Sequence, residues 1–211
     1  MASGHLSSRA RLAGAVNTLS WRDGAWHGCN TDGVGLVSDL LRLGVRLSGA
    51  SVLLVGAGGA ARGVLQPLAQ SGCARIHIVN RTAARALELA ESWRETGAEP
   101  QTRVTAGGLP DAALPGGWNL VVNATASGLQ DAAPELPAGL YAEGAAAYDM
   151  MYGAQPTAFM RQARQDGAAL TADGLGMLVG QAAESFFIWH GVRPDPAPVL
   201  TALREALMAG T

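Results

Sequence analysis

The chain has 211 residues with 15 basic and 17 acidic side chains, a net charge of −2, and 48% of its residues are hydrophobic. This near-neutral charge excludes the electrostatic footprint of a nucleic-acid-binding protein, and no apolar run reaches the roughly 18–20 residues of a membrane helix. All 15 basic residues are arginine, which excludes any mechanism that needs a lysine amine from these residues.

The cysteines, the histidines and the N-terminal residues predict a cytoplasmic protein without a metal site. Cys29 and Cys73 are the only cysteines, and they lack CxxC spacing. We therefore expect free thiols in a reducing compartment. The four histidines are scattered, so they form no pattern of metal ligands. The first twenty residues lack the hydrophobic region of a signal peptide.

The first predicted elements are short. Residues 14–20 have the composition of a strand, residues 21–24 of a turn, and residues 25–28 of a second strand, so we expect a hairpin. The apolar spacing over 33–44 predicts a helix that ends at Gly44.

Strands and helices then alternate along the chain. The patterns predict strands at 51–55, 75–79, 102–105, 119–122, 146–150 and 168–171, and helices at 60–71, 82–95, 156–167, 175–190 and 196–208. This alternation predicts an α/β fold with a doubly wound, parallel, Rossmann-type sheet. The two chain ends fall outside that pattern, so we expect them to form an incomplete second domain.

A glycine-rich loop follows the first buried strand directly and opens a helix. It has the G-x-G-x-x-G/A pattern of dinucleotide-binding proteins, in which the second glycine lets the backbone approach a pyrophosphate at a helix N-terminus. The strand, loop and helix order is the context that this motif requires. The predicted cofactor-binding residues of this loop are Gly56, Ala57, Gly58, Gly59 and Ala60.

The end of the second strand of the sheet predicts the type of dinucleotide. NAD sites usually place an acidic residue there to bind the ribose 2′-hydroxyl, but this strand is followed by Asn80-Arg81-Thr82. Arg81 can pair with a 2′-phosphate, to which Asn80 and Thr82 can hydrogen-bond, and Arg85 lies about one helical turn further on. The sequence therefore predicts NADP.

Two polar residues near the N-terminus become candidates only within a wider pattern. Asp32 alone would be interpreted as a helix cap, and Asn17 alone as a turn or edge residue. However, seven motifs occur in the order and spacing of shikimate dehydrogenases, and the chain resembles that family from about residue 9 to residue 205. The motifs are Gly14–Thr18, Asn30–Gly33, Gly56–Ala61, Asn80–Thr82, Asn123–Thr125, Tyr148–Met150 and Asp173–Met177.

The resemblance implies an enzyme that reduces 3-dehydroshikimate to shikimate with NADPH, in aromatic amino-acid biosynthesis. It implies that Asn17 and Asp32 bind the substrate hydroxyls and that Asp32 is the acidic half of the catalytic pair. Gln181 and Tyr152 are implied as further substrate contacts. For the cofactor, the resemblance places Thr125 near the pyrophosphate, and it places Met150, Gly174 and Met177 along the nicotinamide.

The chain departs from the family at its N-terminus. Family members carry a larger substrate-binding domain, with a lysine that pairs with the aspartate at the position of Asp32. The resemblance therefore implies a truncated chain, with 1–32 as a remnant of that domain, 33–177 as the NADP-binding domain and 178–211 as helices that return to the substrate domain. We expect impaired activity, because arginine, whose pKa exceeds about 12, cannot supply the proton in place of lysine.

Two alternatives stay open. The chain could be a non-catalytic NADP-binding module, or a quinate/shikimate dehydrogenase with altered substrate preference. We also expect a homo-oligomer, because a strand at 14–20 without its neighbours and a bare face of the C-terminal helices invite pairing between copies.

Overall fold

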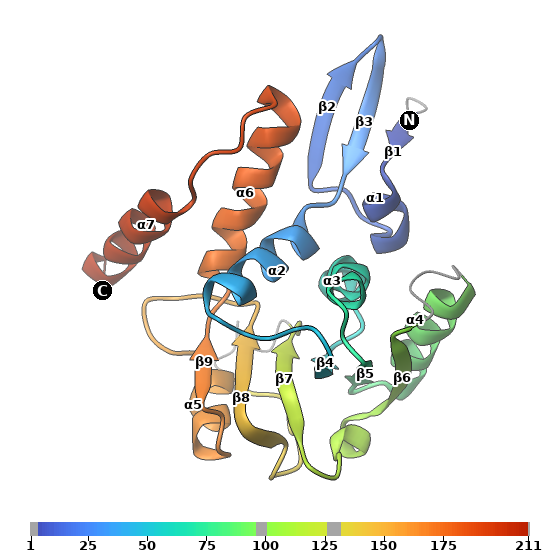
Figure 1. Ribbon diagram of the computed structural model, residues 1–211, viewed down its shortest axis with the longest axis vertical. Helices are drawn as coiled ribbons and strands as arrows, with labels where there is room; N and C mark the ends of the chain where they lie inside the picture. Colours follow the sequence, from blue (N-terminus) through green and yellow to red (C-terminus); the bar gives the residue numbers. More distant parts are fainter. Residues whose placement is uncertain (1–3, 96–100, 126–131, 211) are drawn as a thin grey trace.

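The computed structural model describes residues 4–95, 101–125 and 132–210, and it is built around one parallel sheet (Figure 1). The order in the sheet is β6-β5-β4-β7-β8-β9, and every neighbouring pair is parallel. The prediction of a doubly wound α/β sheet is thereby confirmed. Its strands are β4 (Ser51–Val55), β5 (Arg75–Asn80), β6 (Arg103–Gly108), β7 (Trp118–Asn123), β8 (Tyr141–Asp149) and β9 (Leu170–Ala172).

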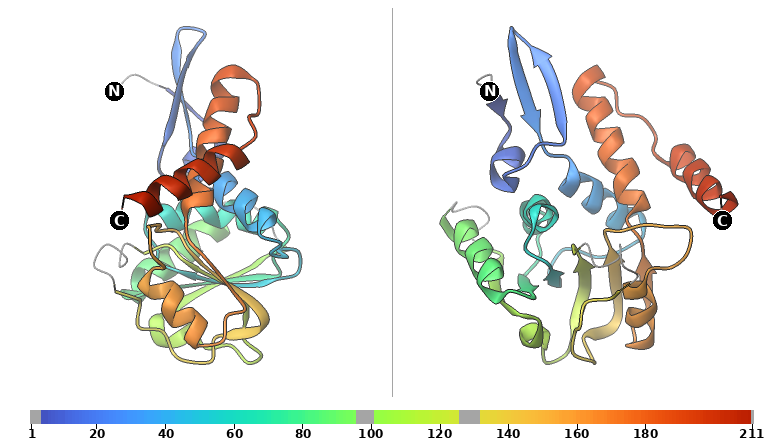
Figure 2. Two further views of the ribbon diagram at one scale, coloured as in Figure 1. Left: turned by 90° about the vertical axis from the view of Figure 1, so that its left-hand side faces the viewer. Right: turned by 180° about the vertical axis from the view of Figure 1, so that it is seen from behind.

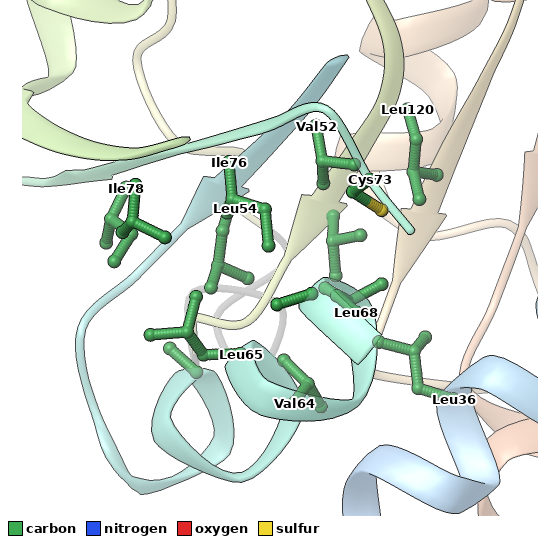
Figure 3. Close-up of a cluster of buried hydrophobic side chains, with 14 of the residues drawn as sticks. Leu36, Val52, Leu54, Val64, Leu65, Leu68, Cys73, Ile76, Ile78 and Leu120 are labelled. Carbon is green, nitrogen blue, oxygen red and sulfur yellow. The ribbon is translucent and has the colours of Figure 1, made fainter. Parts of the chain in front are cut away.

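One face of the sheet is covered by α2 (Asp32–Arg42), α3 (Gly59–Gln70) and α4 (Ala83–Glu95). Figure 3 shows Val64, Leu65 and Leu68 of α3 directed at the aliphatic side chains of β4 and β5. Full burial of a side chain of this kind stabilises a fold by about 1.5–3 kcal/mol relative to exposure. This packing fixes the start of α3, and therefore the glycine-rich loop, against the sheet.

The opposite face is covered by α5 (Ala158–Gln165) and the short 3₁₀ helix η1 (Leu109–Ala112). Phe159 and Ala163 of α5 pack there with alternate residues of the central strands, such as Leu53 and Val121. Because both faces are covered, β4 is apolar at nearly every position. The interpretation of residues 51–55 as a fully buried strand is confirmed.

The N-terminal residues form a second sheet, with the order β1-β3-β2. It consists of β1 (His5–Leu6), β2 (Thr18–Arg22) and β3 (Ala25–Cys29), and α1 (Ser8–Ala13) follows β1. The predicted hairpin exists, but its first strand starts at Thr18 and not at residue 14. The reason is that Gly14, at φ +62°, is the left-handed cap that ends α1. Neither β1 nor α1 was predicted, because both are too short to show a period.

Two helices, α6 (Leu175–His190) and α7 (Ala197–Ala209), complete the structure. Figure 2 shows α6 beside the β2–β3 hairpin, above the end of the large sheet. Trp189 Nε1 donates to the carbonyl of Leu19 at 2.8 Å, which ties α6 to β2. α7 contributes no buried residue. Within the described ranges, no helix is long and apolar enough to cross a membrane.

Candidate functional site: a glycine-rich loop and an Asn–Asp pair

β4 and β7 are neighbours in the large sheet, and the strand order reverses between them, so the chain leaves their carboxyl ends in opposite directions. This is where open parallel sheets bind their ligands. Gly56 follows β4 at φ +113°, and a Cβ added to it would lie 3.0 Å from the carbonyl oxygen of Ala124. The Ala124 N–H in turn donates to Val55 at 2.8 Å. The glycine at 56 is therefore demanded by the tight turn and by the neighbouring loop.

Gly58 differs, because no protein atom lies within 4 Å of the position that its Cβ would occupy. Gly58 is the N-cap of α3, and it supplies no side-chain cap. The first turn of α3 contains no acidic residue. The space beside this helix end is thus open, which suits a phosphate bound by the first turn of the helix, and a side chain at 58 would fill that space. The geometry of the glycine loop is compatible with a pyrophosphate, and its role in binding the cofactor stays a prediction.

The end of β5 carries the predicted 2′-phosphate contacts. Asn80 Nδ2 donates to the carbonyl of Thr82 at 2.9 Å. Arg81 and Arg85 are both exposed, and neither pairs with a carboxylate in the described part of the chain. Two guanidinium groups near the end of β5 are thus available to an anion.

A buried polar network joins the ends of β7 and β8, and sequence reasoning assigned it no role. Asn123 Nδ2 donates to Asp149 Oδ1 at 3.1 Å. Asn123 Oδ1 accepts from the N–H and the hydroxyl of Thr125 at 3.1 and 2.7 Å. The signal for it was present, because Asn123 and Asp149 are polar residues that end two buried apolar strands. This network fixes Thr125 beside Gly56.

Asp149 is fully buried. Burial raises the pKa of its carboxyl above the usual value, while hydrogen bonds from Thr157, Met151 and Asn123 act in the opposite direction. Thr157 is the N-cap residue of α5, and its hydroxyl donates to Asp149 Oδ2 at 2.6 Å. Asp149 therefore ties the end of β8 to α5.

Asn17 and Asp32, which the resemblance pairs as substrate contacts, lie in direct contact. Asn17 Nδ2 donates to Asp32 Oδ1 at 2.9 Å, and Asn30 Nδ2 donates to Asp32 Oδ2 at 3.1 Å. Asn17 Oδ1 accepts from the N–H of Thr31 at 3.0 Å. The amide groups of Asn17 and Asn30 thus hold both carboxylate oxygens of Asp32 in place.

The reading of Asp32 as a helix cap does not hold. Asp32 is the first residue inside α2, and the N-cap is Thr31, which makes no side-chain capping bond. Asp32 Oδ2 instead lies 3.0 Å from the position of a Cβ on Gly63 of α3. The absence of a side chain at Gly63 lets the Asp32 carboxylate lie against the helix that begins at the glycine loop.

The remaining substrate candidates come from α6 and from the segment after β8. Gln181 packs on α2, since a Cβ on Gly35 would lie 2.8 Å from its Cγ. Gly35 is one turn of α2 beyond Asp32, so Gln181 lies at the same end of the molecule as the Asn–Asp pair. Tyr152 is 45% exposed, and within the described residues no hydrogen bond joins its side chain to Asp32 or Gln181.

The three candidates for the nicotinamide side lie close together. Gly174 leaves no room for a side chain, because a Cβ there would overlap the carbonyl of Met150. Its N–H donates to the carbonyl of Met151 at 2.9 Å. Met150 is half-buried, whereas Met177 is only 4% exposed and belongs to the core between the helices and the sheet.

An ion-pair cluster ties the N-terminal segment to α6. Arg9 and Arg193 approach the buried carboxylate of Glu184 at 3.0 and 2.8 Å. Burial alone would raise the pKa of Glu184, but the hydrogen bonds from Arg193 and Arg9 bring it below its usual value. Arg9 is thus engaged with Glu184. In the described part of the chain, no cluster of ligands could hold a metal ion.

Known proteins are similar in sequence to most of this chain. The family model for shikimate/quinate 5-dehydrogenase matches residues 39–105, and the model for the shikimate 5′-dehydrogenase C-terminal domain matches residues 174–204. Shikimate dehydrogenase (NADP(+)) of Bordetella petrii is 78% identical over 99% of this chain and 73% of its own length. The enzyme of the same name from Bordetella avium is 70% identical over 97% of this chain and 71% of its own length.

A solved structure agrees with the sequence relatives. Shikimate 5-dehydrogenase of Thermus thermophilus, in complex with NADP(H) and shikimate, superimposes with a TM-score of 0.80 at 39% identity. The match covers 96% of this chain and 72% of that one. On these identities and shared lengths, the chain belongs to the shikimate dehydrogenase family.

Proposed function

We propose that the chain binds NADPH and 3-dehydroshikimate at the carboxyl end of its large sheet and reduces the substrate to shikimate. As a member of the family it is an oxidoreductase of shikimate dehydrogenase type, with NADP as its cofactor. The observation that carries the site is the contact of the Asp32 carboxylate with α3, the helix whose open N-terminus follows Gly58. A carboxylate suited to a polyhydroxylated substrate thus lies against the same helix whose N-terminus suits a pyrophosphate.

The dinucleotide half of the site follows from the loop and strand ends. The α3 N-terminus and the backbone of Gly56, Ala57, Gly58, Gly59 and Ala60 hold the pyrophosphate, and Thr125 lies beside it. Arg81 binds the 2′-phosphate, assisted by Asn80, Thr82 and Arg85. Met150, Gly174 and Met177 line the nicotinamide. When bound, NADPH supplies the hydride for reduction of the substrate carbonyl.

The substrate half consists of Asn17, Asp32, Tyr152 and Gln181. Amide side chains both donate and accept hydrogen bonds, so Asn17 and Gln181 can pair with hydroxyls without adding charge. Reduction of a carbonyl also needs a proton for the developing alkoxide. Asp32 contributes a carboxylate at this position, and Asn17 and Asn30 hold its two oxygens.

The composition favours slow turnover. Because the 211 residues contain no lysine, no ammonium group from these residues can deliver the proton, and general acid catalysis is typically worth about 10²–10⁴-fold. This observation also supports the second candidate function, a non-catalytic NADP-binding module. A preference for quinate is the third candidate.

Two measurements separate these candidates. Titration of NADPH and NADH by fluorescence tests the cofactor site, and failure to bind NADPH, or tighter binding of NADH, would refute it. NADPH formation from NADP with shikimate, and then with quinate, tests the chemistry. Binding of NADPH without any turnover would favour the non-catalytic module. Faster turnover of quinate than of shikimate would favour the altered substrate preference.

We further propose a three-part organisation with boundaries at 1–32, 33–177 and 178–211, and self-association of the chain. β2 is an edge strand, and Leu19 and Trp21 on it are 54% and 59% exposed. Trp189 on the neighbouring α6 is 52% exposed. An exposed edge beside apolar side chains favours pairing with a second copy. Light scattering tests this, and a monodisperse monomer would contradict it.

A further inference from the structure

The hydroxyl of Tyr148 joins three elements in the interior. Tyr148 lies on β8 and has no exposed surface. Its hydroxyl donates to Asp39 Oδ2 of α2 at 2.7 Å and accepts from the backbone N–H of Met177 of α6 at 3.2 Å. Each of these elements carries or adjoins a candidate site residue. Met150 follows β8, Asp32 begins α2, and Gln181 lies on α6.

The contact with Met177 caps the start of α6. The N-cap residue of this helix is Gly174, which has no side chain to accept from the free N–H groups of the first turn. Asp173 Oδ1 accepts from Leu175 at 3.3 Å, and the Tyr148 hydroxyl accepts from Met177. Unlike the start of α3, the start of α6 is thus occupied by side chains from the protein.

Asp39 determines how the Tyr148 hydroxyl is oriented. The backbone N–H of Met177 can only donate to the Tyr148 oxygen, and the Tyr148 hydroxyl donates its proton to Asp39, so the two contacts together fix the orientation of the hydroxyl. Arg42 Nε donates to the other carboxylate oxygen at 2.7 Å. Gly176 leaves the space that Asp39 fills, since a Cβ there would overlap the carboxylate.

We propose that Tyr148, oriented by Asp39, is a positioning residue for the nicotinamide half of the cofactor site. It acts through the Met177 N–H, which sets where the first turn of α6 lies against Met150 and the end of β8. In the described residues, no hydrogen bond or ion pair joins this network to Arg81 or to the start of α3, where the adenosine half of the site lies. The inference rests on the proposed function, because it assumes that Met150, Gly174 and Met177 line the nicotinamide.

The test compares two ligands in the Tyr148→Phe variant. NADPH carries both halves of the dinucleotide, and 2′,5′-ADP carries the adenosine half with its 2′-phosphate but no nicotinamide. Loss of a buried hydrogen bond is expected to weaken NADPH binding by about threefold to tenfold. The affinity for 2′,5′-ADP is expected to stay within about twofold of the unchanged chain. Tyr141→Phe, at the far end of β8, is the matched control and should change neither affinity.

Each other outcome has a definite meaning. Equal weakening of both ligands would show a general loss of structure, and no weakening of either would show that the hydroxyl is dispensable; both overturn the proposal. Failure of the unchanged chain to bind either ligand would instead refute the proposed function.

Asp39→Asn serves as a second variant if Tyr148→Phe does not fold. Its single carbonyl oxygen must serve either Arg42 or Tyr148, so the hydroxyl loses its fixed orientation. The same weakening confined to NADPH supports the proposal, and equal effects on both ligands contradict it.

Discussion

Asn17 Nδ2 lies 2.9 Å from Asp32 Oδ1, and this contact joins the start of the β2–β3 hairpin to the start of α2. Asn30 holds the second oxygen of the same carboxylate. Both donors are carboxamide groups, so Asp32 is oriented by neutral partners, and among the described residues it forms no ion pair. A substrate hydroxyl or a proton donor can therefore still be attracted to it.

Asp32→Asn is expected to weaken shikimate binding. The new carboxamide would present an NH₂ group to the amide donors of Asn17 or Asn30, and it would offer the substrate no charged acceptor. Hydrogen bonds to charged groups are worth about 1.5–3 kcal/mol, so binding should weaken about tenfold or more. Calorimetric titration of shikimate in the presence of NADP measures this, and the NADPH affinity should stay unchanged. Equal shikimate affinity of the unchanged chain and Asp32→Asn would contradict the assignment of Asp32 to the substrate site.

Gly56→Ala and Gly58→Ala are expected to act on different properties. At φ +113° an alanine at 56 is strained and presses on Ala124, which should cost about 1–3 kcal/mol and lower Tm by several degrees. At 58 the backbone is extended and the space is open, so the Tm of Gly58→Ala should equal that of the unchanged chain. Because the methyl group would fill the pyrophosphate position, we expect NADPH affinity to fall about tenfold or more. A Gly58→Ala chain with full NADPH affinity would show that the open space is not the cofactor site.

Arg81→Ala is expected to weaken NADPH binding about tenfold or more while leaving NADH binding unchanged, because only NADPH carries the 2′-phosphate. Arg85→Ala should also weaken NADPH binding, but by a smaller factor. Arg94→Ala, in the last turn of the same α4 helix, is the matched control. Parallel losses of NADPH and NADH in Arg81→Ala would contradict the assignment of Arg81.

The sequence predicted those parts of the molecule that depend on local pattern. The strand at 51–55 and the glycine loop could be placed because a buried parallel strand is continuously apolar and a phosphate loop needs glycine at defined positions. Contacts between distant residues were not predictable. Nothing in the sequence places Tyr148 beside Asp39, 109 positions away, because that contact depends on how α2 crosses the sheet. The common role of Asn17 and Asp32 as substrate contacts was implied only by resemblance, since each residue alone looked like an ordinary cap or turn, and their direct hydrogen bond was not predicted.

Glu184 is expected to make the stability of the fold depend on pH in the acidic range. Its pKa in the folded protein lies below the ordinary value of 4.5 because Arg193 and Arg9 outweigh the effect of burial. The unfolded chain therefore binds the proton more readily, so the stabilisation is complete above about pH 4.5 and is lost as the pH falls through the lower folded pKa. Tm measured from pH 6 to pH 3 should fall more steeply for the unchanged chain than for Glu184→Gln, whose amide does not titrate. Glu91→Gln, on the exposed surface of α4, is the control, and its Tm should depend on pH as that of the unchanged chain does. Parallel curves of Tm against pH for all three proteins would show that this ion-pair cluster contributes nothing to acid sensitivity.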